Sequence, residues 1–225
     1  MPSEDIKIDN SAHNRLKITE IFYSLQGESN TVGIPTVFIR LTGCPLRCVY
    51  CDTEYAFQGG EWQEIENIIK QIKKYPTNYI TVTGGEPLAQ KNCIKLLKQL
   101  CDLNYQVSIE TSGAIDVSVI DARVVKVIDV KTPGSGESDK NLYSNFSFLY
   151  STDQLKFVLC NKADYDWATK ILVEYELNDL CEILFSASFQ ELPATELANW
   201  ILADGLNVRF QLQLHKFLWG NEHGR

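Results

Sequence analysis

Three cysteines lie within eight residues of one another, Cys44, Cys48 and Cys51, in the spacing C-x3-C-x2-C. Thiolates on one short loop can hold three irons of a [4Fe–4S] cluster, which normally takes four cysteine ligands. No fourth cysteine follows nearby, so one iron would keep an open position for a small molecule. The candidate for that position is S-adenosylmethionine, a cofactor of radical chemistry.

Two other uses of clustered cysteines fit this chain less well. Structural zinc usually takes four ligands in paired spacing, and the nearest further candidates, His13 and Cys93, do not supply it. Disulfide frameworks are typical of short secreted chains with an even cysteine count, whereas this chain has seven cysteines in 225 residues. We expect the remaining cysteines to be buried as small hydrophobic side chains: Cys93, Cys101, Cys160 and Cys181.

The composition is that of one globular domain over residues 1–225, with 44% apolar and 22% charged residues. Residues 1–15 are polar, so we expect a flexible N-terminal segment there and no signal peptide. No stretch is apolar for long enough to span a bilayer, and unpaired cysteines favour the reducing cytoplasm. A net charge of −8 argues against a nucleic acid partner, because phosphate binding needs a basic surface.

Apolar runs rich in β-branched residues alternate with segments of helical periodicity. We expect strands at residues 36–41, 79–83, 107–110, 124–130, 154–159, 182–186 and 208–212, with an extra N-terminal strand at 16–22. Helices are expected at residues 61–74, 89–103, 163–175 and 195–204. Strands that alternate with helices indicate a parallel sheet. The prediction is an α/β fold, an incomplete (β/α) barrel with an abbreviated core, and an open doubly wound sheet is the alternative.

Four motifs follow directly after four of the expected strands. The cysteine triplet is followed along the chain by TGGEP (83–87), ETSG (110–113) and DVKTPGSG (129–136). Because barrel enzymes assemble their sites at the carboxyl ends of parallel strands, we expect one site at that rim. Residues 133–148 are polar and are expected to form a long functional or mobile loop.

Several side chains of this rim could bind a small cofactor. Gly85 lets a ligand approach the backbone closely, and Glu86 could bind a cationic amino group. Ser112 could bind a ribose hydroxyl or a carboxylate, although helix capping is a serious alternative. Asp52 and Thr53 offer oxygen ligands of the kind that Mg²⁺ accepts, with a loop cap as the alternative.

A second group of side chains could bind a substrate. Gln26, Gly27 and Glu28 offer amide and carboxylate groups that suit the edge of a heterocycle, unless they only form a turn. Arg40 lies in an apolar strand, where a guanidinium needs a partner. A substrate carboxylate and an internal salt bridge are equally consistent with it. His215 reaches the site only if the C-terminal tail folds over it.

With these residues in view, the chain resembles the radical S-adenosylmethionine superfamily and, within it, the family of 7-carboxy-7-deazaguanine synthases. The likeness runs from about residue 16 to residue 220, and its most specific segments are IFYSLQGE, FIRLTGCPLRCVYCDTEYA, TVTGGEPL, IETSG, DVKTPGSG and QLHKFLWG. The resemblance implies an incomplete barrel of the radical SAM type. It also implies a homodimer that uses a [4Fe–4S] cluster, S-adenosylmethionine and Mg²⁺.

The resemblance further implies roles for individual residues. The cluster would be bound by Cys44, Cys48 and Cys51, and Mg²⁺ by Thr53. S-adenosylmethionine would be surrounded by Tyr50, Cys51, Asp52, Gly85, Glu86 and Lys131. The substrate would contact Leu25, Gln26, Gly27, Glu28, Arg40, Thr83 and His215.

The reaction implied by the resemblance belongs to queuosine and deazapurine biosynthesis. It contracts the ring of 6-carboxy-5,6,7,8-tetrahydropterin to 7-carboxy-7-deazaguanine and releases ammonia. A 5′-deoxyadenosyl radical from S-adenosylmethionine would abstract hydrogen from C6 of the pterin, and a reductase or flavodoxin-type protein would donate the electron. No side chain is assigned a catalytic step, because the protein's share is positioning and exclusion of solvent.

Two other functions are alternatives to this interpretation. Activases of glycyl radical enzymes share the cysteine triplet, but typically continue with His-Asn where this chain has Asp52 and Thr53. A metal-stabilised binding module without catalysis would leave the four strand-end motifs unexplained. A shared fold cannot separate these functions, so the site residues must do so.

Overall fold

The computed structural model describes residues 14–189 and 191–224, and within them the chain forms one nine-stranded sheet. The strand order is β3-β1-β2-β4-β5-β6-β7-β8-β9. All neighbouring pairs from β2 to β9 are parallel, whereas β1 is antiparallel to both β2 and β3. In the described residues, β3 and β9 stand at the two ends of this order and do not pair with each other, so the barrel is incomplete and the predicted fold class is confirmed.

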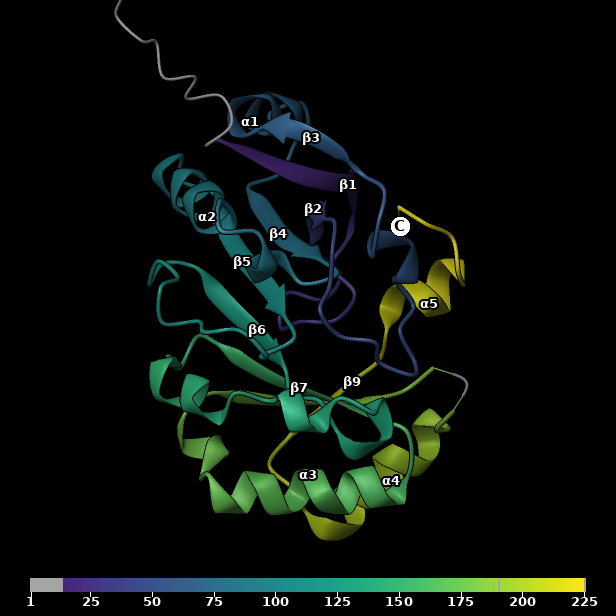
Figure 1. The fold of residues 1–225 in the computed structure, drawn as a ribbon. Coiled ribbons are helices and arrows are strands. Elements are labelled where there is room, and N and C mark those ends of the chain that lie inside the picture. Colours follow the sequence, from purple (N-terminus) through teal and green to yellow (C-terminus); the bar gives the residue numbers. More distant parts are fainter. Residues whose placement is uncertain (1–13, 190, 225) are drawn as a thin grey trace, which may run out of the picture.

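The strands are β1 (Arg15–Leu25), β2 (Pro35–Leu41), β3 (Glu61–Glu64), β4 (Tyr79–Gly84), β5 (Gln106–Thr111), β6 (Val125–Asp129), β7 (Gln154–Leu159), β8 (Glu182–Ala187) and β9 (Arg209–Gln211). The helices are α1 (Ile65–Ile72), α2 (Cys93–Asp102), α3 (Lys162–Glu174), α4 (Ala194–Asp204) and α5 (Leu214–Trp219). Figure 1 shows α1 to α4 along the outside of the curved sheet, while α5 lies apart from them near the C-terminus. None of the helices in the described part of the chain is long and apolar enough to cross a membrane.

The packing of α1 shows why the outer helices attach to the sheet. Ile65, Ile68 and Ile72 recur at helical spacing and are buried in the hydrophobic core. The core is continuous from β1 to α4, with buried apolar side chains from nearly every strand. Because the helices α1 to α4 cover the outer face of the curved sheet, its inner face is available for a cavity.

Three expected elements differ in the structure. Residues 61–64 are not helical, because they pair as β3 with Arg15–Ile18 at the otherwise unpaired edge of β1. The second helix begins only at Cys93, after a 3₁₀ turn at Pro87–Ala89. Residues 133–148 form three short 3₁₀ helices. The expected flexible segment falls mainly on residues 1–13, which lie outside the described residues, and β1 already begins at Arg15.

Candidate active site

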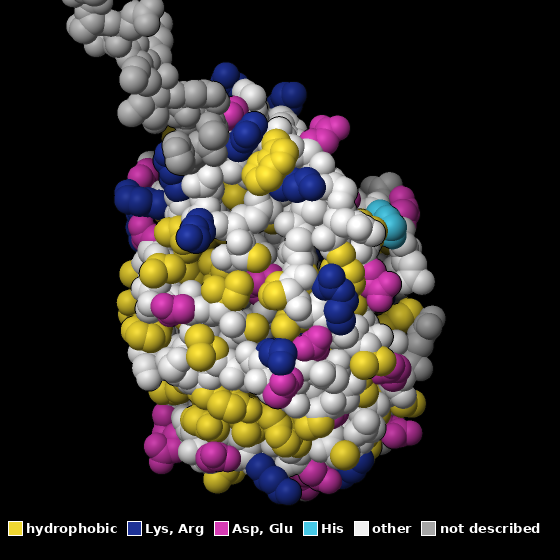
Figure 2. All heavy atoms as spheres, in the orientation of Figure 1, with side chains coloured by type: hydrophobic (Ala, Val, Ile, Leu, Met, Phe, Trp, Pro, Cys, Tyr) yellow, Lys and Arg dark blue, Asp and Glu magenta, His cyan; other side chains and the backbone are white. Residues whose placement is uncertain are grey.

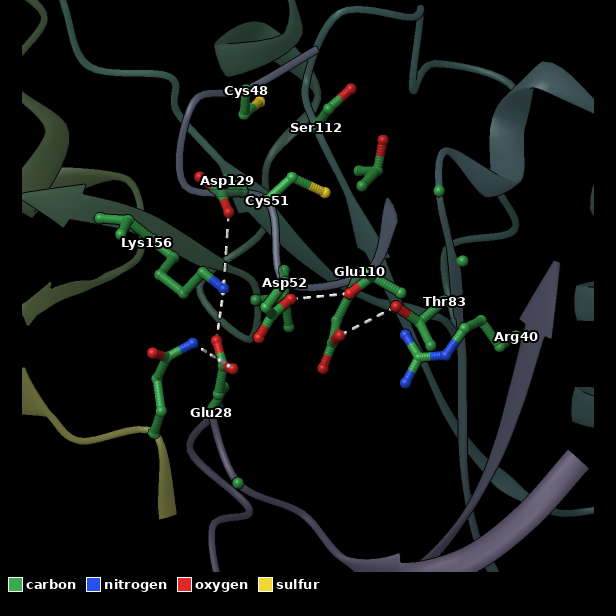
Figure 3. A pocket seen from close by; sticks show the side chains of 18 of the residues that line it. Glu28, Arg40, Cys48, Cys51, Asp52, Thr83, Glu110, Ser112, Asp129 and Lys156 are labelled. Atoms are coloured by element: carbon green, nitrogen blue, oxygen red, sulfur yellow. Dashed lines mark hydrogen bonds and ion pairs between the residues drawn. The ribbon is translucent and has the colours of Figure 1, made fainter. Parts of the chain in front are cut away.

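A cavity of about 220 Å³ opens at the carboxyl ends of the parallel strands. Its wall includes all three cysteines of the triplet and residues of the three other strand-end motifs. The close view in Figure 3 shows one or two side chains of each motif around one space, namely Cys48, Cys51, Thr83, Ser112 and Asp129. The structure therefore brings the four motifs together at one rim. It also brings Leu25, Gln26, Gly27, Glu28, Arg40, Thr83 and His215 to the same wall.

The cysteine loop is held against the TGGEP turn. Cys44, Cys48 and Cys51 are unpaired and half-buried. The carbonyl of Gly43 accepts a hydrogen bond from the Glu86 amide at 2.8 Å. A Cβ atom at Gly85 would lie 2.5 Å from the Gly43 carbonyl oxygen and 2.7 Å from the Cβ atom of Cys44. Gly85 is thus required for the close approach of the two loops.

The three thiols fit an iron–sulfur cluster better than a single ion. Each thiolate of a cluster binds a separate iron, whereas the ligands of one zinc ion all lie within about 2.3 Å of it. Within residues 14–189 and 191–224, no three His, Cys, Asp or Glu side chains are close enough to hold a single metal ion. Burial raises the pKa of the Cys48 thiol, and the ammonium of Lys131 acts in the opposite direction. Lys131 therefore favours the thiolate that a cluster needs.

Two polar atoms beside the cysteines are buried without a hydrogen-bond partner in the described structure, namely the Tyr50 hydroxyl and Oδ1 of Asp129. Such groups are costly unless something satisfies them. The other oxygen of Asp129 lies 3.2 Å from Nζ of Lys131. This part of the wall fits a polar, charged cofactor, and the assignments of Tyr50 and Lys131 to it remain predictions.

Glu86 is placed differently from the other candidates. Its side chain is completely buried and does not line the cavity. The carboxylate accepts hydrogen bonds from the Leu88 amide at 2.9 Å, from Oγ1 of Thr111 at 2.9 Å, and from both the amide and Oγ of Ser112 at 2.7 and 2.6 Å. Glu86 thus joins the TGGEP and ETSG motifs behind the wall. Ser112 does reach the cavity, although its hydroxyl is donated to Glu86.

The C-terminal helix α5 brings His215 to the cavity wall. This was the condition under which His215 could belong to the site. Nε2 of His215 lies 3.9 Å from Oδ2 of Asp52, and Nζ of Lys216 lies 3.2 Å from the same oxygen. The Thr53 hydroxyl donates to Oδ1 of Asp52 at 2.7 Å. Burial would raise the pKa of Asp52, but the nearby His215 ring, the hydrogen bond from Thr53 and the charge of Lys216 outweigh it and hold the pKa well below its usual range.

The loop after β1 is shaped by Gln26, which is almost fully buried. Its amide oxygen accepts hydrogen bonds from the amides of Gly27 and Glu28 at 2.7 and 3.0 Å. Its amide nitrogen donates to Oε1 of Glu110 at 3.2 Å. Oε2 of Glu110 accepts from the Thr83 hydroxyl at 3.0 Å. Gln26 therefore fixes the loop and anchors it to β5.

Arg40 forms the internal ion pair that was one of the two alternatives, and its contact with a substrate carboxylate stays a prediction. Its Nε lies 2.7 Å from Oε1 of Glu20, which is an internal ion pair. Figure 3 shows the other two guanidinium nitrogens pointing toward the cavity, which Arg40 lines. They are placed to bind a carboxylate.

Lys156 was not recognised from the sequence as a site residue. It extends from β7 into the cavity wall, and its Nζ lies 2.7 Å from Oε2 of Glu28 and 3.5 Å from Oδ2 of Asp129. The available signal was a lysine in the middle of the apolar run QLKFVL. A charged residue in a strand that is buried throughout needs a partner.

Comparisons with known proteins show the family of the chain. A sequence model of the radical SAM superfamily matches residues 38–128. The chain is 39% identical to a 7-carboxy-7-deazaguanine synthase of Koribacter versatilis, over 92% of this chain and 98% of the relative. It is 41% identical to a second one, of Chlorobaculum tepidum, over 91% and 94%.

Solved structures show the same fold. The crystal structure of QueE from Escherichia coli matches with a TM-score of 0.74 at 22% identity, over 94% of this chain and 99% of that one. Streptococcus suis SuiB bound to S-adenosylmethionine matches with a TM-score of 0.54 at 14% identity, over 76% of this chain and 45% of that one. Given its identity to the curated relatives over nearly its whole length, the chain belongs to the 7-carboxy-7-deazaguanine synthase family of radical SAM enzymes.

Proposed function

We propose that the cavity is where this enzyme contracts 6-carboxy-5,6,7,8-tetrahydropterin to 7-carboxy-7-deazaguanine, with its [4Fe–4S] cluster and S-adenosylmethionine on the cysteine side. The activity and these cofactors follow from the family, and Mg²⁺ belongs to the same set. The observation that carries the placement is that three unpaired thiols and the Arg40 guanidinium share one cavity wall. Neither the activase nor the binding module is favoured.

On the cofactor side, the chain offers the thiols of Cys44, Cys48 and Cys51 as cluster ligands. When bound, the cluster and S-adenosylmethionine supply the radical that abstracts hydrogen from the substrate. The charges of Lys131 and Asp129 and the hydroxyl of Tyr50 provide polar partners for S-adenosylmethionine. Their role is to orient the cofactor toward the substrate side.

On the substrate side, Arg40 binds the pterin carboxylate through its two outer nitrogens, and Glu28 accepts N–H groups of the heterocycle. The support is the position of both residues on the cavity wall. Thr53 and Asp52 lie beside them and provide oxygen atoms for Mg²⁺. His215 and α5 exclude solvent from this side, because they cover the loop around Gly27.

An electron donor of the reductase or flavodoxin type, a homodimer and a cytoplasmic location belong to the same proposal. Val49, next to the cluster ligand Cys48, is 72% exposed, which leaves an approach for a donor protein.

The support for the homodimer is a surface patch. Hydrophobic side chains gather on the lower part of the face in Figure 2, and such patches often mark contacts between proteins.

The test is anaerobic turnover of the reconstituted, reduced enzyme with S-adenosylmethionine, Mg²⁺ and 6-carboxytetrahydropterin. Mass spectrometry should detect 7-carboxy-7-deazaguanine and 5′-deoxyadenosine together. Deoxyadenosine without deazaguanine would reject this substrate and favour the activase. Neither product from protein with a complete cluster would reject the placement of catalysis in this cavity.

A further inference from the structure

Lys156 is the one charged residue of β7, whose other residues are Gln154 and four apolar side chains. All six residues of β7 are buried, and the neighbours of Lys156 on the strand are Leu155 and Phe157. Burying an ammonium costs free energy unless it is paired. A Leu or Met would satisfy the packing at this position, so the charge itself calls for an explanation.

The ammonium of Lys156 joins two parts of the cavity wall that come from distant segments. Its Nζ lies 2.7 Å from Oε2 of Glu28 and 3.5 Å from Oδ2 of Asp129. Nζ of Lys131 lies 3.2 Å from the same Asp129 oxygen. A row of alternating charges therefore runs from Glu28 on the proposed substrate side to Lys131 on the cofactor side, and Figure 3 shows its first two links.

We propose that Lys156 is a positioning residue for the reaction: it holds the Glu28 carboxylate ionised and aimed at the heterocycle of the substrate. The proposal rests on the proposed role of Glu28. Lys156 acts through Glu28, because the short ion pair fixes one carboxylate oxygen. The other oxygen, Oε1, accepts from Nε2 of Gln213 at 3.0 Å and lies 3.7 Å from Nδ1 of His215. With both oxygens held, the carboxylate has one orientation toward the cavity.

Three charged or titratable side chains from other segments act on Glu28, namely Lys156, His215 and Asp52. Burial acts to raise the pKa of Glu28, the charges of Lys156 and His215 lower it, Asp52 raises it, and the net effect is a lowered pKa. Lys156 itself is held charged by Glu28, Asp129 and Glu110, so its pKa is raised despite burial. Removing the Lys156 charge leaves burial and Asp52 to dominate, and the pKa of Glu28 then rises. A protonated Glu28 loses acceptor capacity toward the heterocycle.

The test compares two variants that differ in charge. Lys156→Met keeps most of the length and removes the charge, and Lys156→Arg keeps the charge. For Lys156→Met we expect KM and Kd for the pterin to rise at least about tenfold at neutral pH. The Kd for S-adenosylmethionine should rise much less, because the contact of Lys156 with Asp129 is the longer one. Relative to the unmodified enzyme, its pterin affinity should increase as pH rises, because Glu28 ionises only at higher pH. Lys156→Arg should restore most of the affinity and remove this pH dependence.

A matched control is Lys126, another buried lysine, whose Nζ lies 2.8 Å from Asp153 but which does not line the cavity. Lys126→Met should lower stability without changing pterin affinity. Anaerobic calorimetry with the pterin gives a readout that does not depend on turnover. Adding Glu28→Gln to Lys156→Met should remove the pH dependence, since no carboxylate remains to titrate.

Two outcomes would overturn the role of Lys156. One is an equal loss of affinity for the pterin and for S-adenosylmethionine in Lys156→Met. The other is a pH profile that matches that of the unmodified enzyme. Failure of the proposed function gives a different result, since the unmodified enzyme would then not bind the pterin at all. If Lys156→Met does not fold, Lys156→Gln, which also removes the charge but keeps a polar group, is measured in its place. Unchanged pterin affinity in folded Lys156→Gln would overturn the role of Lys156.

Discussion

Glu20 and Arg40 are register partners on the antiparallel strands β1 and β2, and Nε of Arg40 lies 2.7 Å from Oε1 of Glu20. The Tyr55 hydroxyl donates to the same carboxylate oxygen at 2.8 Å. The ion pair uses only Nε of the guanidinium, so it orients the two outer nitrogens and leaves them available to donate hydrogen bonds to a ligand. Glu20 thereby acts as the support of Arg40 on the extra N-terminal strand.

We expect Glu20→Gln to weaken pterin binding through Arg40, by roughly tenfold, since a charge-assisted hydrogen bond is lost. Arg40→Ala should have a larger effect on pterin binding and little effect on S-adenosylmethionine binding. Both affinities can be measured by anaerobic calorimetry. Tyr55→Phe is the control, because it removes a hydrogen bond to Glu20 but keeps the ion pair. Equal losses for both ligands in Arg40→Ala would contradict the carboxylate contact.

Cluster assembly should depend on the triplet and not on the other cysteines. Cys48→Ala is expected to abolish it, because two thiolates cannot replace the three local ligands of an open-site cluster. Iron and sulfide analysis after reconstitution provides the measurement. Cys101→Ala should keep a full cluster, since this buried cysteine does not line the cavity. Full iron and sulfide in Cys48→Ala would disprove the ligand assignment.

The position of Glu86 separates a structural role from a role in cofactor binding. Glu86→Gln replaces one carboxylate oxygen by an NH₂ group, which cannot accept the hydrogen bonds that Thr111 and Ser112 donate. We therefore expect it to lower the free energy of unfolding by about 2–4 kcal/mol. Chemical denaturation measures this loss. Thr111→Val, which removes one of the donors to the carboxylate, should cost less. Unchanged stability with a large loss of S-adenosylmethionine affinity would instead favour direct contact with the cofactor.

Gly27 makes room for the ring that α5 brings to the site. In Gly27→Ala the new Cβ atom would lie 2.8 Å from Nδ1 of His215. The ring must shift, so we expect a higher KM for the pterin, by roughly tenfold, with the cluster intact. His215→Ala in the same chain removes the clash, so the double variant should be no worse than His215→Ala alone. Strictly additive losses would argue against this contact.

The amino-acid sequence alone determined the parallel α/β architecture and the rim where the motifs meet. Hydrophobic periodicity marks strands and helices, and a motif that follows a strand directly must lie at the end of that strand. The same local logic placed the thiols and Gly85 at one site, whereas the resemblance to the family assigned Arg40 to it. It misassigned residues 61–64, because their strand pairing depends on β1, some 45 residues away along the chain.

Only the tertiary structure decided which side chains share the cavity and which support it from behind. Glu28 and Lys156 are 128 residues apart in the chain, yet they form one ion pair. Glu86 meets Ser112 across 26 residues and is turned away from the cavity. The direction of a side chain depends on sheet register and on the neighbours that fill the remaining space. These are properties of several strands together, and no single stretch of sequence contains them.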